Sequence, residues 1–166
     1  MEKQNIAMNR SDREITNLNQ IEEILAKANI LRVALCENNL PYVIPVNFGY
    51  KEKSIYIHCA KKGKKIDILT RNNNVSFEVD IDTELVGAEN ACGCSMKYKS
   101  VVGFGKAYFI LDSKEKKQAL DIIMAHYFKG VFEYSLGEIE KTCLIRIDID
   151  SMTGKKSAVG HIYFKH

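Results

Sequence analysis

The chain lacks tryptophan, has only 2 prolines among its 166 residues, and contains no long apolar run. A helix that crosses a bilayer needs roughly 20 consecutive apolar residues, and no segment comes close to that length. Residues 1–9 (MEKQNIAMN) also lack the apolar stretch of a secretory signal. We therefore expect a cytoplasmic protein without a membrane partner.

A surplus of charge of one sign is also missing, because 24 Lys and Arg stand against 21 Asp and Glu, for a net charge of +3. This balance excludes a polycationic arm that binds nucleic acid and a strongly acidic tail. The hydrophobic fraction of 46% is that of an ordinary globular protein. We expect a single domain over residues 1–166, with 1–9 and 157–166 as flexible tails.

The cysteines are few and odd in number, which argues against a disulfide framework. They are Cys36, Cys59, Cys92, Cys94 and Cys143. Cys92 and Cys94 form a CxC pair that, with Cys59 or a histidine, could bind zinc or exchange disulfides. No second paired motif completes four ligands, so structural or incidental thiols are favoured and we expect no metal.

The hydrophobic pattern predicts one early helix and then a series of strands. Apolar residues recur at helical spacing over 17–28, while period-two segments rich in β-branched and aromatic residues follow. The predicted strands are 30–36, 42–50, 54–59, 75–80, 97–110 and 142–150. Further helices are expected after Lys65, ending near Asn72, and over 113–128, while 83–94 is predicted to be a loop and 153–156 a turn.

Six strands with short connections predict an α+β protein: an antiparallel β-barrel with flanking helices. A doubly wound sheet would need strands that alternate with helices of about 10–15 residues, and the chain lacks that alternation. Gly103-Phe104-Gly105 resembles the start of a dinucleotide-binding GxGxxG motif, but the third glycine is missing. The pattern therefore excludes a Rossmann fold.

Four lysines lie almost side by side between a predicted strand and a predicted helix, at positions 61, 62, 64 and 65. An anion there would meet ammonium groups, backbone N–H donors and the positive end of the helix dipole, and Gly63 allows close backbone approach. Phosphate is the obvious candidate. A solvated loop is the alternative that the charge run alone leaves open.

Two neighbouring strands carry further candidate residues. If Ile55 and Ile57 face the core, His58 faces the opposite side of its strand, where an imidazole is expected at a rim, an interface or a ligand. Pro45 cannot donate a hydrogen bond to a sheet, so its strand, which also contains Asn47, borders an edge, a bulge or a ligand. A structural histidine and an ordinary edge strand are the alternatives.

Four segments together resemble one known family, over about residues 10–156. They are VIPVNFGY (43–50), IYIHCA (55–60), GKKID (63–67) with Asn72 a few residues on, and SMKYKSVVGFGK (95–106). In this order they are similar to the flavin-binding split barrels related to pyridoxamine 5′-phosphate oxidase, and within them to the 5-nitroimidazole-resistance (Nim) type.

The resemblance implies a six-stranded split barrel that forms a homodimer and binds FMN in two clefts at the subunit interface. It implies that Val43, Pro45, Val46, Asn47 and Phe48 line the isoalloxazine ring, and that His58, Cys59 and Ala60 lie beside it. Lys64 and Lys65 would hold the phosphate, and Tyr98 and Ser100 would approach from the interface strand.

The resemblance further implies an FMN-dependent oxidoreductase that reduces a small electron acceptor, such as a nitroaromatic (5-nitroimidazole-like) compound, with NAD(P)H as a candidate donor. His58 would be its catalytic residue, as a proton donor or a substrate-orienting group. The arginines that the vitamin oxidases carry are replaced by Lys64 and Ser100, which argues against that activity. A flavin- or heme-binding storage protein and a thiol or zinc protein built on Cys92 and Cys94 are the competing hypotheses.

Overall fold

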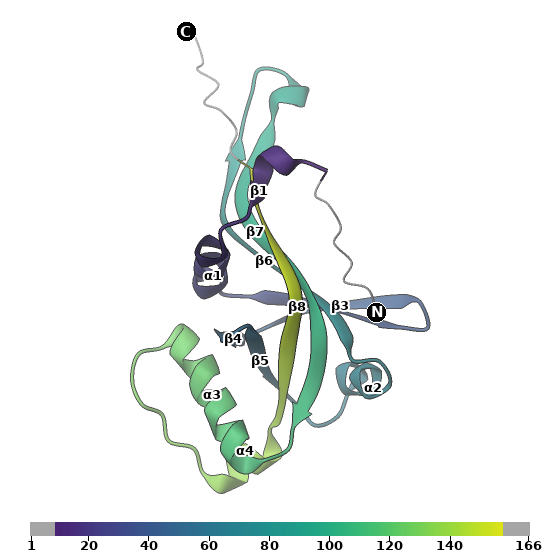
Figure 1. Cartoon of the computed structure of the whole chain (residues 1–166), viewed down its shortest axis with the longest axis vertical. Helices are drawn as coiled ribbons and strands as arrows, with labels where there is room; N and C mark the ends of the chain where they lie inside the picture. Colours follow the sequence, from purple (N-terminus) through teal and green to yellow (C-terminus); the bar gives the residue numbers. More distant parts are fainter. Residues whose placement is uncertain (1–8, 158–166) are drawn as a thin grey trace. The chain divides into compact units, whose positions relative to one another are not determined.

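The computed structural model describes residues 9–157, so the predicted tails lie outside the described residues except for positions 9 and 157. Four α-helices are present: α1 (Leu18–Lys27), α2 (Lys64–Arg71), α3 (Ser113–Tyr127) and α4 (Leu136–Lys141) (Figure 1). The strands are β1 (Glu14–Ile15), β2 (Leu31–Glu37), β3 (Leu40–Val46), β4 (Phe48–Lys51), β5 (Ser54–Cys59), β6 (Asn74–Val86), β7 (Ser95–Ile110) and β8 (Cys143–Ser157). None of the helices between residues 9 and 157 is long and apolar enough to cross a membrane.

The chain divides into two compact units. Within the described residues, unit 1 comprises 9–28, 79–102 and 153–157, and unit 2 comprises 29–78 and 103–152. Strands β6, β7 and β8 each contribute one part to unit 1 and one part to unit 2. The expectation of a single domain stays a prediction.

The strands form an eight-stranded sheet in the order β3-β2-β6-β7-β8-β5-β4, with β1 on β8. The pairs β2–β3, β2–β6, β4–β5, β5–β8 and β1–β8 are antiparallel. Because the order begins at β3 and ends at β4, the described sheet does not close into a ring. The predicted antiparallel α+β fold with flanking helices is confirmed, but with eight strands where six were expected.

One added strand is the short β1, and the other comes from a break at Asn47. The sequence predicted a single strand over 42–50, yet Val46 of β3 pairs with Leu31 of β2, whereas Phe48 of β4 pairs with Ile57 of β5. The two halves therefore join opposite ends of the sheet order. An uninterrupted apolar pattern cannot show that its halves pair with different strands.

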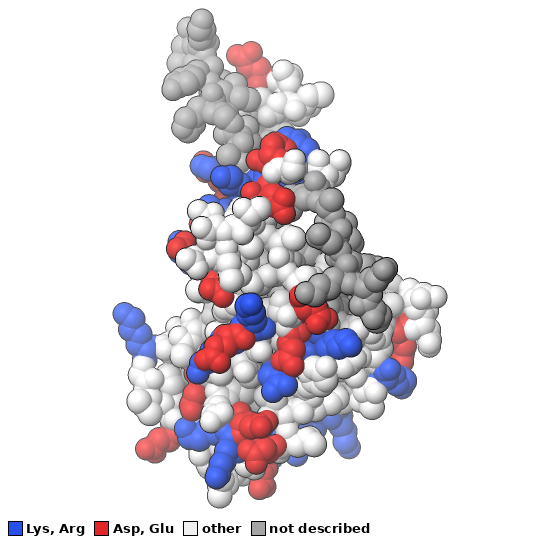
Figure 2. Space-filling model, in the orientation of Figure 1, with Lys and Arg blue, Asp and Glu red and all other residues white. Residues whose placement is uncertain are grey.

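The core of unit 2 is made of alternating residues on the strands and of one face of α3. Its fully buried side chains include Phe48, Ile55, Ile57, Phe77, Leu144, Ile145 and Ile147. Helix α3 lies along β4 and β5, and α2 lies on β2 (Figure 1). Charged side chains of both signs interleave on the face of the molecule that Figure 2 shows.

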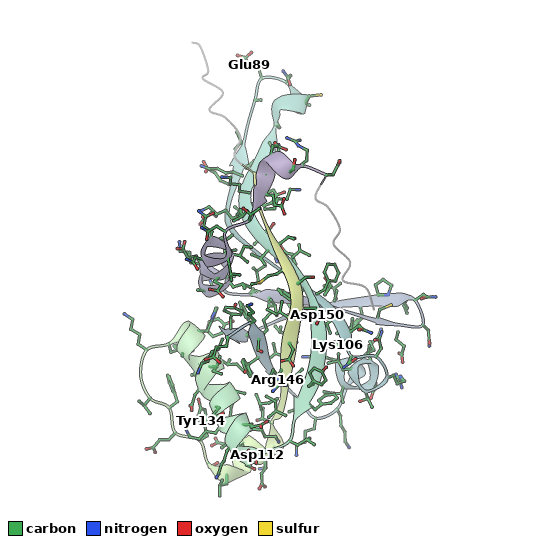
Figure 3. All side chains as sticks on the ribbon, viewed as in Figure 1. Glu89, Lys106, Asp112, Tyr134, Arg146 and Asp150 are labelled. Carbon is green, nitrogen blue, oxygen red and sulfur yellow. The ribbon has the colours of Figure 1, made fainter. Side chains whose placement is uncertain are left out.

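Helix starts explain which helices the sequence could predict. Asp112, labelled in Figure 3, accepts hydrogen bonds from the backbone N–H groups of Lys114 (2.9 Å) and Glu115 (3.0 Å) and so caps the helix that was predicted over 113–128. Helix α4 was not predicted, although Ser135 and Glu138 form a complete capping box. Its six residues are too few to show a helical period.

Two predictions in unit 1 are wrong. Residues 83–86, predicted as loop, extend β6. The Glu84 carboxylate forms an ion pair with the Lys97 ammonium of β7 (3.0 Å), and Leu85 is 76% exposed. Residues 153–156, predicted as a turn, extend β8, because Gly154 pairs with Ile15 of β1. Both extensions lack an alternating apolar pattern, so only their pairing partners make them strands.

Gly49 of β4 provides a test of how closely α3 packs on the sheet. A Cβ at this buried position would lie 2.6 Å from the carbonyl oxygen of Ile122 and 2.8 Å from the backbone nitrogen of Ile123. Replacing Gly49 by Ala should therefore lower the free energy of unfolding by about 1–3 kcal/mol, measured by urea denaturation. Gly137→Ala, at a position with open space around it, is the matched control and should not destabilise the chain. Equal stabilities of the two variants would contradict the packing.

Candidate functional site

Strand β5 presents His58 to solvent at its end. Ile55 and Ile57 are 0% and 1% exposed, while His58 is exposed, so the predicted alternation is confirmed. Tyr56 lies on the same side of the strand as His58 but packs against the buried cluster that contains Ala119 and Ile123 of α3. The helix thus covers this face of β5 at Tyr56 and leaves it open at His58.

Strand β3 is an edge strand, as Pro45 led us to expect. It stands first in the sheet order and bonds only to β2 among the strands of residues 9–157, with Pro45 opposite Arg32. Val43 is 58% exposed, and Pro45 and Asn47 are exposed as well. The outer side of β3 therefore offers apolar surface together with backbone groups that no neighbouring strand uses.

The junction between β3 and β4 is fixed by a tyrosine of α3. The backbone N–H of Phe48 donates to the Tyr127 hydroxyl (3.0 Å), which itself donates to the carbonyl oxygen of Asn29 (2.9 Å). Burial raises the pKa of Tyr127, and hydrogen bonds from Phe48 and Asn47 partly offset the rise. The neutral hydroxyl can therefore accept and donate at once, which holds the strand where it breaks.

Helix α2 begins at the lysine run without a side-chain cap. Gly63 is its N-cap, with a φ of 129° that favours glycine, whereas α1, α3 and α4 begin with Asn17, Asp112 and Ser135, whose side chains accept hydrogen bonds from the first turn. Lys64 is exposed and Lys65 is half-buried in that turn. The first turn of α2 therefore combines positive charge with N–H groups to which no capping side chain is bonded.

Contacts at both ends hold α2 on the strands that precede it. The Lys64 ammonium lies 4.6 Å from the centroid of the Tyr42 ring on β3. At the other end, the Asn72 side-chain amide donates to the carbonyl oxygen of Cys36 on β2 (2.9 Å), and Arg71 forms an ion pair with Glu37. The lysine run and the outer edge of β3 are therefore neighbours in space.

These features form one candidate site in unit 2. The pairing of Phe48 with Ile57 brings the β3–β4 junction to the end of β5, and the chain then runs through residues 60–63 into α2. Ten of the predicted site residues belong to this unit: Val43, Pro45, Val46, Asn47, Phe48, His58, Cys59, Ala60, Lys64 and Lys65. A strand edge, an exposed imidazole and a cationic helix start suit a flat, anionic ligand.

Cys59 and Cys143 lie opposite each other on β5 and β8. Burial raises the pKa of Cys143 to about 11, helped by the charge and hydrogen bonding of Cys59 and opposed by Lys116 and Lys65. At neutral pH this thiol is therefore protonated. The sequence pattern offered no signal for the pair, because 84 positions separate the two cysteines.

The remaining predicted residues, Tyr98 and Ser100, belong to unit 1 and are described with it. Tyr98 lines a cavity of about 520 Å³ together with Asp82, Thr83, Glu84, Lys97, Lys99, Lys156 and Ser157. A hydrogen bond from Lys99 (2.8 Å) lowers the pKa of Asp82. Ser100 is half-buried beside the fully buried Val101.

The CxC pair is not part of the candidate site. Cys92 and Cys94 are exposed in unit 1, whereas Cys59 belongs to unit 2. The Cys94 thiol lies within hydrogen-bonding distance of the carbonyl oxygens of Ala88 (3.8 Å) and Asn90 (3.7 Å). Among residues 9–157, no three His, Cys, Asp or Glu side chains cluster closely enough to hold a metal ion.

Sequence reasoning did not name Tyr127 as a site residue, although it lies within the helix predicted over 113–128. Its ring contacts that of His126 at 4.7 Å, and His126 in turn lies 4.5 Å from Phe48. A helical period shows that such a ring is buried, but it does not show which backbone group its hydroxyl will meet. No signal in the sequence alone could have assigned it to the β3–β4 junction.

Comparison with known proteins identifies relatives of the chain. A family model described as pyridoxamine 5′-phosphate oxidase matches residues 17–156. A Bacteroides thetaiotaomicron structure, provisionally assigned to 5-nitroimidazole antibiotic resistance, is 38% identical, with a TM-score of 0.78 and 86% of each chain covered. No curated protein matches.

Two further structures are similar at 20% identity, which shows the fold alone. A flavocytochrome from Azotobacter vinelandii has a TM-score of 0.81, with 92% of this chain and 72% of the other covered. An FAD and heme binding protein from Mycobacterium smegmatis has a TM-score of 0.80, with 87% and 73% covered.

The raised pKa of Cys143 predicts a pH dependence of stability. Its folded value of about 11 exceeds the ordinary 9.0, so the native chain binds this proton more tightly than the unfolded chain does. The stabilisation is complete below pH 9 and is lost as the pH rises through about 11. Under reducing conditions, the difference in the free energy of unfolding between the wild type and Cys143→Ala should be constant below pH 9. Above pH 9, the wild type should lose stability relative to the variant. A difference independent of pH would contradict the assignment.

Proposed function

The chain belongs to the pyridoxamine 5′-phosphate oxidase family, and from this membership we propose that it is an FMN-binding oxidoreductase that reduces small molecules such as nitroaromatic compounds. The 38% identity to the Bacteroides protein, over 86% of both chains, supports this choice within the family. The observation that carries the proposal is the cationic first turn of α2 beside the open edge of β3.

The first turn of α2 suits the phosphate of the cofactor. Lys64 and Lys65 would neutralise its charge, while the N–H groups of the turn, which no side chain caps, would donate hydrogen bonds. Gly63 carries no Cβ, and apart from its two chain neighbours no atom of residues 9–157 lies within 4 Å of the point where one would stand. A phosphate can therefore approach this backbone closely.

The edge of β3 and the end of β5 suit the isoalloxazine ring. The exposed side chains of Val43 and Pro45 offer apolar surface. Val46, Asn47 and Phe48 would border the ring at the strand break, with the Phe48 N–H itself bonded to the Tyr127 hydroxyl. His58, Cys59 and Ala60 would border the ring from β5. Tyr127 would act indirectly, because its hydroxyl accepts a hydrogen bond from the Phe48 N–H (3.0 Å) and so fixes the position of the β3–β4 junction.

The proposal includes a homodimer, in which Tyr98 and Ser100 of one protomer would approach the cofactor bound by its partner. NAD(P)H is the proposed donor of electrons. When bound, the flavin would supply the electron-transfer chemistry, and the protein would supply orientation and local charge. The exposed imidazole of His58 would donate a proton to the acceptor or orient it.

Binding of flavin or heme without turnover is the alternative function. The flavocytochrome and the FAD and heme binding protein share the fold at 20% identity, so they do not favour that alternative for this chain. Purified protein distinguishes the two: flavin absorption that NAD(P)H bleaches supports the reductase, whereas a Soret band or an inert flavin supports passive binding.

Loss of the two helix lysines should weaken cofactor binding. Each charge-assisted hydrogen bond contributes roughly 1.5–3 kcal/mol, reduced by the partial exposure of the turn. The double variant Lys64→Ala/Lys65→Ala should therefore raise the Kd for FMN about tenfold or more, as measured by fluorescence quenching. Lys61→Ala/Lys62→Ala, in the same run but ahead of the helix, is the matched control and should bind FMN nearly as the wild type does. Equal affinities in the two double variants would exclude the site.

Loss of the His58 imidazole should slow turnover while FMN stays bound. Replacing His58 by Ala removes the proposed proton donor and should lower the rate of nitroimidazole reduction at least tenfold. The rate is measured anaerobically, as reoxidation of the reduced flavin, after absorbance has established equal occupancy. Lys62→Ala, which removes a neighbouring exposed charge, serves as the control. A wild-type rate in His58→Ala would remove this residue from the mechanism.

A further inference from the structure

The register of β5 and β8 places two cysteines directly opposite each other. Cys59 is the last residue of β5 and pairs with Cys143, the first residue of β8. Directly opposed residues of antiparallel strands point to the same face, with Cα atoms about 4.5–5.5 Å apart. A disulfide needs Cα atoms about 4.4–6.8 Å apart, so these two thiols can be joined without rearranging the strands.

Two lysines beside the pair oppose the effect of burial on Cys143. Both cysteines are half-buried, and Cys143 hydrogen-bonds with Cys59. The ammonium groups of Lys65 and Lys116 favour a thiolate at Cys143, against the effect of burial. Lys116 is held beside the pair, because its ammonium group donates to the carbonyl oxygen of Thr142 (3.4 Å).

The other cysteines of residues 9–157 have no such arrangement. Cys36 of β2 pairs with Pro41 of β3, and Cys92 and Cys94 are exposed in unit 1. Two cysteines separated by a single residue cannot face each other across a ladder. Cys59 and Cys143 are therefore the only two cysteines that lie opposite each other across neighbouring strands in the described part of the chain.

We propose that Cys59 and Cys143 form an oxidation site, a dithiol that a low-molecular-weight disulfide such as oxidised glutathione converts to an intrachain disulfide. The proposal does not depend on the flavin. It assigns thiol chemistry to two cysteines to which the proposed reductase gives no redox role, although Cys59 would border its flavin, at the strand end that leads into the lysine run at positions 61–65.

The reaction proceeds by two thiol–disulfide exchanges. Cys59 gives up its proton to water, and its sulfur attacks oxidised glutathione, which forms a mixed disulfide and releases one glutathione thiolate that takes up a proton. Cys143 then gives up its proton to water and attacks the Cys59 sulfur, which forms the Cys59–Cys143 bond and releases the second glutathione as a thiolate that is protonated in turn. Two protein thiols are oxidised and one disulfide is reduced to two thiols. Cys59 reacts first, because burial keeps Cys143 protonated.

The test uses the full chain with the substitutions Cys36→Ser, Cys92→Ser and Cys94→Ser, which leave only the proposed pair. After incubation of the folded protein with oxidised glutathione, its intact mass should fall by two hydrogen atoms, and a reductant should reverse the loss. Adding Cys143→Ser removes the resolving thiol, so this variant should instead gain the mass of one glutathione and keep it. Digestion without reductant should yield a peptide pair linked through Cys59 and Cys143.

Three results would overturn the proposal: a stable glutathione adduct on the chain that keeps both cysteines, disulfide-linked dimers of that chain, or two thiols that stay reduced in the folded protein but oxidise in urea. Circular dichroism checks that each variant is folded. Should Cys36→Ser unfold the chain, non-reducing peptide mapping of the oxidised wild type is the deciding measurement. There, a Cys59–Cys143 link supports the site and any other pairing excludes it.

Discussion

Strand β5 is the constraint on which the rest of unit 2 depends. It is hydrogen-bonded on both sides, to β4 and to β8, and its inward residues Ile55 and Ile57 are almost fully buried. A slip of one residue would move both isoleucines to the outer face, so the core determines the register. That register then places Phe48 at the strand junction, leaves His58 exposed and sets Cys59 against Cys143.

The candidate site follows from how the chain enters and leaves β5. Ahead of it, the break at Asn47 sends β3 and β4 to opposite ends of the sheet order, and Tyr127 holds that break with its hydroxyl. Beyond it, the lysine run leads into α2, whose first turn has no side-chain cap. The edge of β3 and the start of α2 meet where the Lys64 ammonium lies over the Tyr42 ring. An overall charge of +3 therefore includes a local concentration of cations beside an open strand edge.

The sequence predicted well those features that depend on neighbouring residues. The helices over 17–28 and 113–128 and the alternation of β5 all have short-range signals, and all are present. It failed where a partner far along the chain decides the outcome. Residues 83–86 and 153–156 are strands because β7 and β1 lie beside them, and their own polar composition conceals this.

The fold class, the family and the residues that could carry chemistry can all be predicted from the order of the amino acids, because motif order and hydrophobic period are properties of the chain. Which of those residues contact one another depends on the folded structure. Lys64 reaches Tyr42, Tyr127 holds Phe48, and Cys59 faces Cys143 because strand register and helix packing bring distant segments together. Burial then changes their chemistry, as the protonated Cys143 thiol shows. That effect depends on the surrounding atoms, which no local pattern encodes.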